Sequence, residues 1–270
     1  MSASTFLALP AEIRNQIYEL ALTSPQPLRI RKTVTGAPIF NQLKHANKQL
    51  YAETAHLELM YNNLLVCAES WDEPPAQMLL GWLSSIPPAK NGWIKTVTLK
   101  YDVLGITKSR MAATQDAQDD PAAPRMQHIT TTTAPDFPED AKTFRRLAEV
   151  CRANPSMRIH YQLPAWIFHE QEELIMFGHA LQALFTFREN RLFHDLLEDF
   201  PRSTGLVPVL TRIVNVLDSV VAWRKDVRVR DMWADNLRFF PTHTEEDRAS
   251  LKPSGLGGWD HVRKWILEGI

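Results

Sequence analysis

The apolar positions nearest the N-terminus repeat at helical spacing. Ile13, Ile17 and Leu20 are four and three residues apart, so the pattern predicts that they share one face of a helix. Tyr18 widens this face. Pro10 falls in the first turn, where the N–H group that proline lacks would have no partner within the helix. The pattern therefore predicts an amphipathic helix that begins at Pro10.

The polar positions of the same segment complete the pattern. Arg14, Asn15 and Glu19 are predicted to lie mostly on the side opposite the apolar face. Thr23-Ser24-Pro25 ends the helix, because the residue before a proline avoids the helical backbone conformation. An ordinary amphipathic helix packed on its own core is one interpretation of this segment. A helix that grips another protein is the second.

Apolar runs and alternation predict strands farther along the chain. Residues 28–34 alternate and are followed by a break at 36–38, which favours a short hairpin. Residues 63–67 form a continuous apolar run that is typical of a buried strand. Residues 93–101 alternate cleanly, and a further strand is predicted at 157–163.

Two of these strands are preceded by segments in which apolar residues have helical spacing. Apolar residues repeat at this spacing over 76–86 and over 140–154. The resulting helix–strand units at 76–101 and 140–163 are predicted to pack as neighbouring strands of a small, partly parallel sheet. A distant leucine-rich-repeat-like arrangement stays open as an alternative, although the consensus of that repeat is absent. The last third of the chain is predicted to be mainly helical.

Composition separates one segment from the rest of the chain. The segment at about 105–139 is rich in Ala, Thr, Asp, Gln and Pro and has few large apolar residues. Such a segment cannot bury enough surface to offset its ordering entropy. We therefore predict a flexible insertion, which is either a passive loop or a partner-binding segment. The hydrophobic content of the whole chain, 44%, is ample for a core.

Charge and cysteine content narrow the classes of function. The formal net charge of −1 gives no electrostatic signal for nucleic acid or for an anionic membrane. Cys67 and Cys151 fit neither a disulfide framework nor a metal knuckle, and both are predicted to be buried free thiols. No apolar run approaches the ~18 residues that span a bilayer, and no signal peptide is recognisable. We expect a cytoplasmic or nuclear protein.

Motifs for catalysis and for cofactor binding are missing. The chain has no metal-binding pair of histidines, no phosphate-binding loop and no Gly-x-Ser-x-Gly sequence. We therefore expect no enzymatic activity, no cofactor and no metal site. An enzyme without a recognisable motif is the open alternative, and it would need a pocket that gathers His160, His169 or His179 with carboxylates.

Arginines lie between two tryptophans in a second candidate surface near residue 230. Its residues are Trp223, Arg224, Arg228, Arg230 and Trp233. Such a mixture can bind an acidic peptide or single-stranded nucleic acid. It can also form a solvated face on which the arginine stems pack over tryptophan. Since the net charge gives no support, we do not expect a nucleic-acid partner.

Two blocks of the sequence resemble the F-box. Leu9-Pro10-x-Glu12-Ile13-Arg14-x-x-Ile17-Tyr18 is similar to the opening of that domain. Asn47-Lys48-Gln49-Leu50-Tyr51-Ala52-Glu53-Thr54, followed by Tyr61-Asn62-Asn63, is similar to a second block in the F-box-like proteins of filamentous fungi. The resemblance covers roughly residues 5–66.

The resemblance implies a protein-interaction adaptor. An F-box docks on a Skp1-like adaptor protein, and the rest of the chain then captures a protein substrate for ubiquitin transfer. By resemblance, an apolar face would bind the partner through Leu9, Pro10, Ile13, Ile17 and Leu20.

The segment between the two blocks departs from a standard F-box, because a hairpin is predicted where a helix should be. This departure favours the alternative, a non-catalytic binding or structural protein in which the motif is internal core and does not bind Skp1. In that case Ile13→Ala and Ile17→Ala would each destabilise the fold by ~2–5 kcal/mol.

These patterns together predict an α+β fold that is predominantly helical. Residues 1–70 would form an F-box-like module of helices with a short hairpin. Residues 71–270 would form a helix-rich body with helix–strand units, the flexible insertion and a C-terminal helical region.

Overall fold

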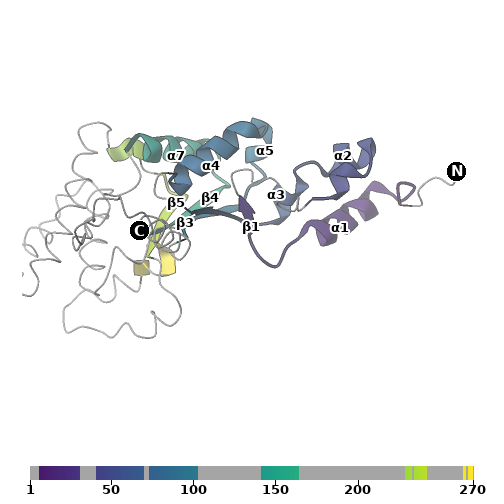
Figure 1. Cartoon of the computed structure of the whole chain (residues 1–270), viewed down its shortest axis with the longest axis horizontal. Coiled ribbons are helices and arrows are strands. Elements are labelled where there is room, and N and C mark those ends of the chain that lie inside the picture. Colours follow the sequence, from purple (N-terminus) through teal and green to yellow (C-terminus); the bar gives the residue numbers. More distant parts are fainter. Residues whose placement is uncertain are drawn as a thin grey trace, which may run out of the picture.

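The chain folds around a five-stranded, all-parallel sheet with strand order β1-β2-β3-β4-β5 (Figure 1). This computed structural model describes residues 6–30, 41–69, 73–102, 141–163, 229–232, 234–241, 264–265 and 267–269. The predicted α+β class is thereby corrected to a mixed α/β fold, because the sheet is parallel throughout and helices alternate with its strands along the chain. The predicted insertion at about 105–139 and most of the predicted C-terminal helical region lie outside the described residues.

The N-terminal module, residues 6–61, consists mainly of short helices. It contains α1 (Ala11–Leu22), the 3-10 helix η1 (Leu43–His45), α2 (Lys48–Thr54) and α3 (Leu57–Tyr61). The carbonyl of Pro10 accepts the first backbone hydrogen bonds of α1, from Ile13 and Arg14. The side chain of Asn47 caps α2 by accepting a hydrogen bond of 2.8 Å from the N–H group of Leu50. The predicted helix starting at Pro10 is thus confirmed.

The strands follow one another across the sheet in chain order. They are β1 (Leu28–Ile30), β2 (Leu64–Ala68), β3 (Thr96–Tyr101), β4 (Arg158–Leu163) and β5 (Leu237–Pro241). Between them the chain forms α4 (Pro75–Ser85), α5 (Pro88–Asn91), α7 (Ala141–Ala153) and the 3-10 helix η3 (Val229–Met232). The parallel pairing of β3 with β4 confirms that the two predicted helix–strand units are neighbours.

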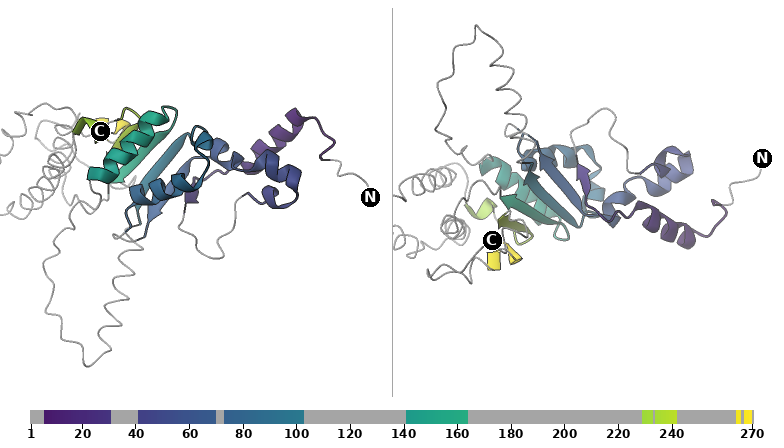
Figure 2. Two further views of the ribbon diagram at one scale, coloured as in Figure 1. Left: turned by 90° about the horizontal axis from the view of Figure 1, so that it is seen from above. Right: turned by 60° about the horizontal axis from the view of Figure 1, so that its bottom comes forward.

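The helices α4 and α7 cover one face of the sheet (Figures 1 and 2). Each central strand turns every second residue toward them, and these residues are buried: Val97, Leu99 and Tyr101 on β3, and Ile159, Tyr161 and Leu163 on β4. Phe144 and Leu147 of α7 pack into the same core. On β3 and β4 the intervening strand residues are half-buried or exposed, so the two faces of the sheet differ in character there.

Strands β1 and β5 correct two predictions. β1 pairs in parallel with β2, so it belongs to the main sheet instead of a separate hairpin. Residues 31–40, the remainder of the predicted hairpin, lie outside the described residues. β5 was predicted to belong to the helical C-terminal region. It forms a strand because Leu237 and Phe239 alternate with Arg238 and Phe240, which lets one side join the core beside β4.

Two hydrophobic clusters hold these parts together. The larger one lies between the sheet and its helices. The smaller one, in the N-terminal module, is built on Tyr18, Leu22 and Leu50. Cys67 and Cys151 are buried free thiols, as predicted. The boundary at residue 70 stays a prediction, although β1 and β2 precede it and share a sheet with β3.

Within the described residues, no helix is both long enough and apolar enough to cross a membrane.

Candidate functional site

A polar network links the two sequence blocks that resemble the F-box. The guanidinium of Arg14 donates two hydrogen bonds to the carboxylate of Glu53, at 3.0 and 2.8 Å, and a third to the carbonyl of Leu9. The Tyr18 hydroxyl donates to the same carboxylate at 2.5 Å, and the Gln49 amide donates to it at 3.0 Å. This Glu53 clamp fixes α1 against α2.

The clamp shifts the pKa values of its members. Hydrogen bonds from Arg14, Tyr18 and Gln49 lower the pKa of Glu53 to about 2. Burial and the hydrogen bond to Glu53 raise the pKa of Tyr18 to about 12, and the Glu53 carboxylate raises the pKa of Arg14. All three groups therefore keep one protonation state near neutral pH. Such fixed states suit a structural role and not proton transfer, for which a pKa near the working pH is needed.

Asparagines complete the polar framework of the module. The amide of Asn62 donates to the carbonyls of Leu22 and Glu58, at 2.6 and 2.9 Å, and its oxygen accepts from the N–H group of Ser24 at 2.6 Å. Asn41 donates to the carbonyl of Thr54 at 2.7 Å. Asn62 thereby ties the end of α1 to α3. The polar residues of the two blocks thus act mostly within the module.

The orientation of α1 corrects the predicted assignment of its faces. Arg14, Tyr18 and Leu22, spaced by four residues, face the module, and Tyr18 and Leu22 are buried. Arg14 was predicted to lie on the outer, polar side, but its side chain is only 14% exposed. The sequence signal that could have revealed this was the opposite charge of two residues, an arginine in the first block and an acid, Glu53, in the second.

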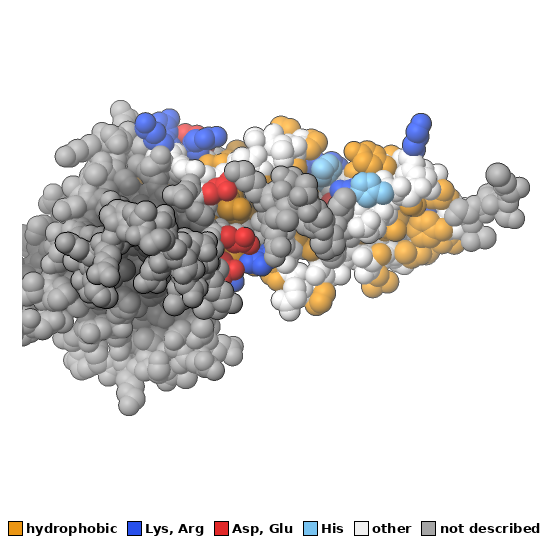
Figure 3. Space-filling model, in the orientation of Figure 1, with side chains coloured by type: hydrophobic (Ala, Val, Ile, Leu, Met, Phe, Trp, Pro, Cys, Tyr) orange, Lys and Arg blue, Asp and Glu red, His pale blue; other side chains and the backbone are white. Residues whose placement is uncertain are grey.

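Three apolar residues of α1, Ile13, Ile17 and Leu20, lie on its outer side. Ile13 is 42% exposed, Ile17 is 36% exposed and Leu20 is 82% exposed. Pro10 is also exposed, whereas Leu9 is half-buried. We call Pro10, Ile13, Ile17 and Leu20 the outer face of α1. Figure 3 shows apolar side chains gathered over this end of the molecule.

Other large apolar side chains of the module are exposed as well. Tyr51 on α2 is 55% exposed and Met60 on α3 is 42% exposed. Leu57 and Tyr61 instead pack against the small cluster around Tyr18. Tyr51 and Met60 are therefore exposed themselves, and Leu57 and Tyr61 are engaged in the small core.

The second candidate surface falls largely outside the described residues. Trp223, Arg224, Arg228 and Trp233 are not described, and only the backbone of Arg230 is, within η3. In the described parts of the chain, no group of three His, Cys, Asp or Glu side chains is placed to hold a metal ion. His160 lies in a pocket at the sheet, whereas His169 and His179 are not described.

Comparisons with protein-family models, with curated proteins and with solved structures found no match for this chain. The resemblance to the F-box therefore rests on the two sequence blocks alone.

Proposed function

We propose that this chain is a protein-interaction adaptor whose N-terminal module docks on a Skp1-like adaptor protein through the outer face of α1. The remainder of the chain would then present a captured protein for ubiquitin transfer, as the substrate-recognition subunit of a Skp1-cullin-F-box type ligase. Such a role belongs in the cytoplasm or the nucleus.

One observation carries the proposal. Ile13, Ile17 and Leu20 are exposed, although Tyr18 and Leu22 of the same helix are buried. The Glu53 clamp thus holds one side of α1 to its own module. Ile13, Ile17 and Leu20 on the other side remain available to a partner. A contiguous group of exposed aliphatic side chains on one helix is typical of a protein–protein contact.

The energetics of the outer face agree with a partner contact. Full burial of one Ile or Leu side chain contributes about 1.5–3 kcal/mol. Because Ile13 and Ile17 are already more than half buried, covering all three side chains contributes about 2–5 kcal/mol, while association costs on the order of 4–15 kcal/mol. The outer face can therefore supply part of the binding free energy, and neighbouring residues such as Pro10 must add contacts to it.

Co-purification with a Skp1-like protein from the same organism tests the proposal. The interface variant is Ile13→Asp/Leu20→Lys, which leaves the net charge unchanged and places each new charge at the helix end that favours it. The control variant is Asn15→Asp/Glu19→Gln, which also leaves the net charge unchanged but alters exposed polar positions. We expect the adaptor to co-purify with the wild type and the control, and not with the interface variant.

The alternative is a binding or structural protein that does not use Skp1. A folded wild-type chain that fails to retain the adaptor would favour it. Equal retention by the interface variant and the control would also contradict the proposal, because the outer face would then not be the contact. Circular dichroism of both variants checks that a loss of binding is not a loss of folding.

A further inference from the structure

The face of the sheet opposite α4 and α7 carries basic residues on β3, β4 and β5. By strand alternation, this polar face carries Lys100 on β3, Arg158 and His160 on β4, and Arg238 on β5. Thr98, His160 and Arg238 are in register on three neighbouring strands. No strand position on this face is acidic within the five described strands.

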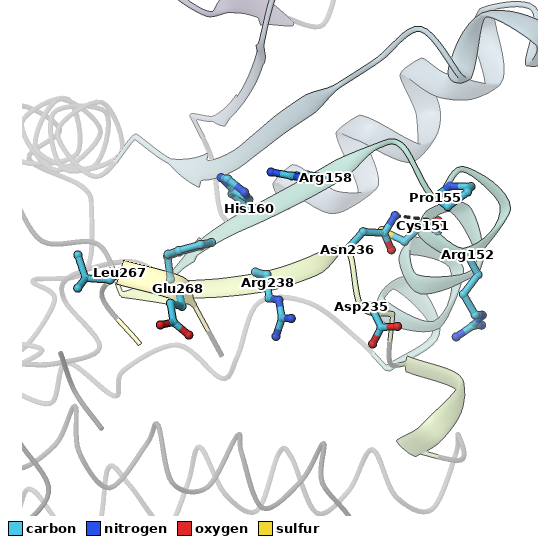
Figure 4. Close-up of a pocket in the computed structure, with 11 residues that line it drawn as sticks. Cys151, Arg152, Pro155, Arg158, His160, Asp235, Asn236, Arg238, Leu267 and Glu268 are labelled. Atoms are coloured by element: carbon cyan, nitrogen blue, oxygen red, sulfur yellow. Dashed lines mark hydrogen bonds between the residues drawn. The ribbon is translucent and has the colours of Figure 1, made fainter. Parts of the chain in front are cut away.

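A pocket of about 660 Å³ lies at β4 and β5 and extends to the end of α7, where Cys151 and Arg152 line it (Figure 4). Arg158, His160 and Arg238 line it, together with the ring of Phe240. The two carboxylates of the pocket, Asp235 and Glu268, come from outside the strands. Figure 4 shows Arg158 and His160 on one side of the pocket, with Arg238, Asp235 and Glu268 on the other.

The arginine on β4 differs from the others in its surroundings. Arg158 is exposed, and within the described ranges its guanidinium has neither a hydrogen bond nor an ion pair. By contrast, Arg29 on β1 pairs with Asp102 at 3.4 Å, and Arg152 donates to the carbonyl of Asp231 at 3.0 Å. In the described part of the chain, Arg158 thus presents a positive charge without an ion-pair partner at the edge of the pocket.

His160 lines the pocket and is affected by the charge of Arg158. Its ring lies against Phe240, with ring centroids 4.8 Å apart. Burial, and then the charge of Arg158, lower the pKa of His160, so the ring is neutral at pH 7. A neutral imidazole beside Arg158 can donate one N–H hydrogen bond without adding to the repulsion between positive groups.

We propose that the polar face binds an acidic segment of the captured protein, with carboxylates at Arg158, Arg238 and Lys100 and an apolar side chain in the pocket against Phe240. The role assigned to this surface, recruitment of a substrate, rests on the proposed adaptor function. The binding itself does not depend on Skp1.

The spacing of the positive groups favours an extended segment over a single phosphate group. The groups come from three adjacent strands, which are about 4.8 Å apart in any sheet, and Figure 4 shows that Arg158 and Arg238 extend in different directions. One small anion cannot contact all of them. In an extended peptide, alternate side chains are about 6.6 Å apart, so successive carboxylates can reach separate groups.

Fluorescence anisotropy on the full chain, without any adaptor, tests this proposal. The probe is a labelled peptide of about twelve residues with Glu at alternate positions and one central Leu, and the comparison peptide has Gln in place of every Glu. We expect the Glu peptide to bind at least about tenfold more tightly than the Gln peptide, with affinity that falls as salt is raised. We also expect its binding to raise the pKa of His160, measured by NMR, because carboxylates favour the charged imidazole.

Charge-reversal variants locate the site. Arg158→Glu should weaken binding of the Glu peptide by about tenfold or more. Arg145→Glu is the matched control, because Arg145 is exposed on α7 and, among the described residues, pairs within that helix, with Glu149 at 2.9 Å. It should change the affinity by less than about twofold.

Four results would overturn the proposal. They are no binding of the Glu peptide, equal binding of both peptides, equal losses in the Arg158 and Arg145 variants, and tighter binding of a polyuridine oligonucleotide or of a singly phosphorylated neutral peptide. Retention of Skp1 is a separate measurement, so failure of this proposal and failure of the adaptor function are distinguishable.

Discussion

The N-terminal module and the parallel sheet are stabilised in different ways. The module has a small apolar core built on Tyr18, Leu22 and Leu50, and the Glu53 clamp joins its helices. The sheet buries a row of apolar side chains on every central strand beneath α4 and α7. Polar contacts are thus central to the module, and burial of apolar area is central to the sheet.

This difference explains how the module can leave apolar residues outside. Because Arg14, Tyr18 and Glu53 hold α1 by hydrogen bonds, Ile13 and Leu20 are not needed for its attachment. The consequence is a module that should open locally at lower free energy than the sheet.

Truncation inside the sheet should produce the largest effect. Leu99 is fully buried on β3, so Leu99→Ala should lower the free energy of unfolding by ~2–5 kcal/mol through lost burial and a cavity. Urea denaturation measures this loss. The control is Thr98→Ala, the preceding residue on the polar face, which should cost less than about 1 kcal/mol. Equal losses in the two variants would contradict the assignment of faces.

Disruption of the Glu53 clamp should have an intermediate, local effect. Glu53→Gln keeps the size of the side chain but removes the charge, so it should destabilise the module by about 1–3 kcal/mol. Hydrogen–deuterium exchange should become faster in α1 and α2 and stay unchanged in β3 and β4. Glu12→Gln, at an exposed acid of α1, is the control. Faster exchange throughout the sheet would mean that the two regions are not separable.

Protonation of Glu53 by acid should weaken the N-terminal module and leave the sheet unaffected. The pKa of Glu53 is lowered from 4.5 to about 2, so its stabilisation is complete above pH 4.5 and is lost as the pH falls toward 2. NMR signals of α1 recorded over this range should broaden or shift as the clamp opens. The Glu53→Gln variant should lack this pH dependence, and an identical pH dependence in both proteins would refute the role of the clamp.

Truncation on the outer face of α1 should have the smallest effect on stability. Ile17 is 36% exposed, so Ile17→Ala should change the free energy of unfolding by less than about 1 kcal/mol. Leu22→Ala on the buried side of the same helix should cost ~2–5 kcal/mol. Chemical denaturation of both variants checks the difference. A loss of ~2–5 kcal/mol at Ile17 would support the alternative in which the motif is internal core.

Much of the sheet could be predicted from the sequence. The apolar run of β2 and the alternation of β3 specify strands, and the helix before β4 has one apolar side, with Phe144, Leu147 and Cys151. The places of β1 and β5 in the sheet were harder to predict, because the pattern of a short edge strand does not specify the strand with which it pairs. Consequently β1 was not predicted to belong to the main sheet, and the class was set too far toward α+β.

The faces of α1 illustrate a limit of hydrophobic periodicity. Periodicity identifies which residues share a face, but it does not tell which face is turned inward. Here the inward side contains Arg14, which is held by an acid 39 residues away in the chain. Such long-range polar pairs leave no periodic signal, and so Ile13, Ile17 and Leu20 could be grouped but not oriented. The polar face of the sheet was missed for a similar reason, because its basic residues come from separate strands.

Hydrogen–deuterium exchange of the chain, with and without a purified Skp1-like adaptor, tests the central claim most directly. The account predicts that saturating adaptor slows exchange in residues 10–22 and leaves β3 and β4 unchanged. Slower exchange confined to the sheet, or no change anywhere at saturating adaptor, would contradict the claim that the outer face of α1 is a docking surface.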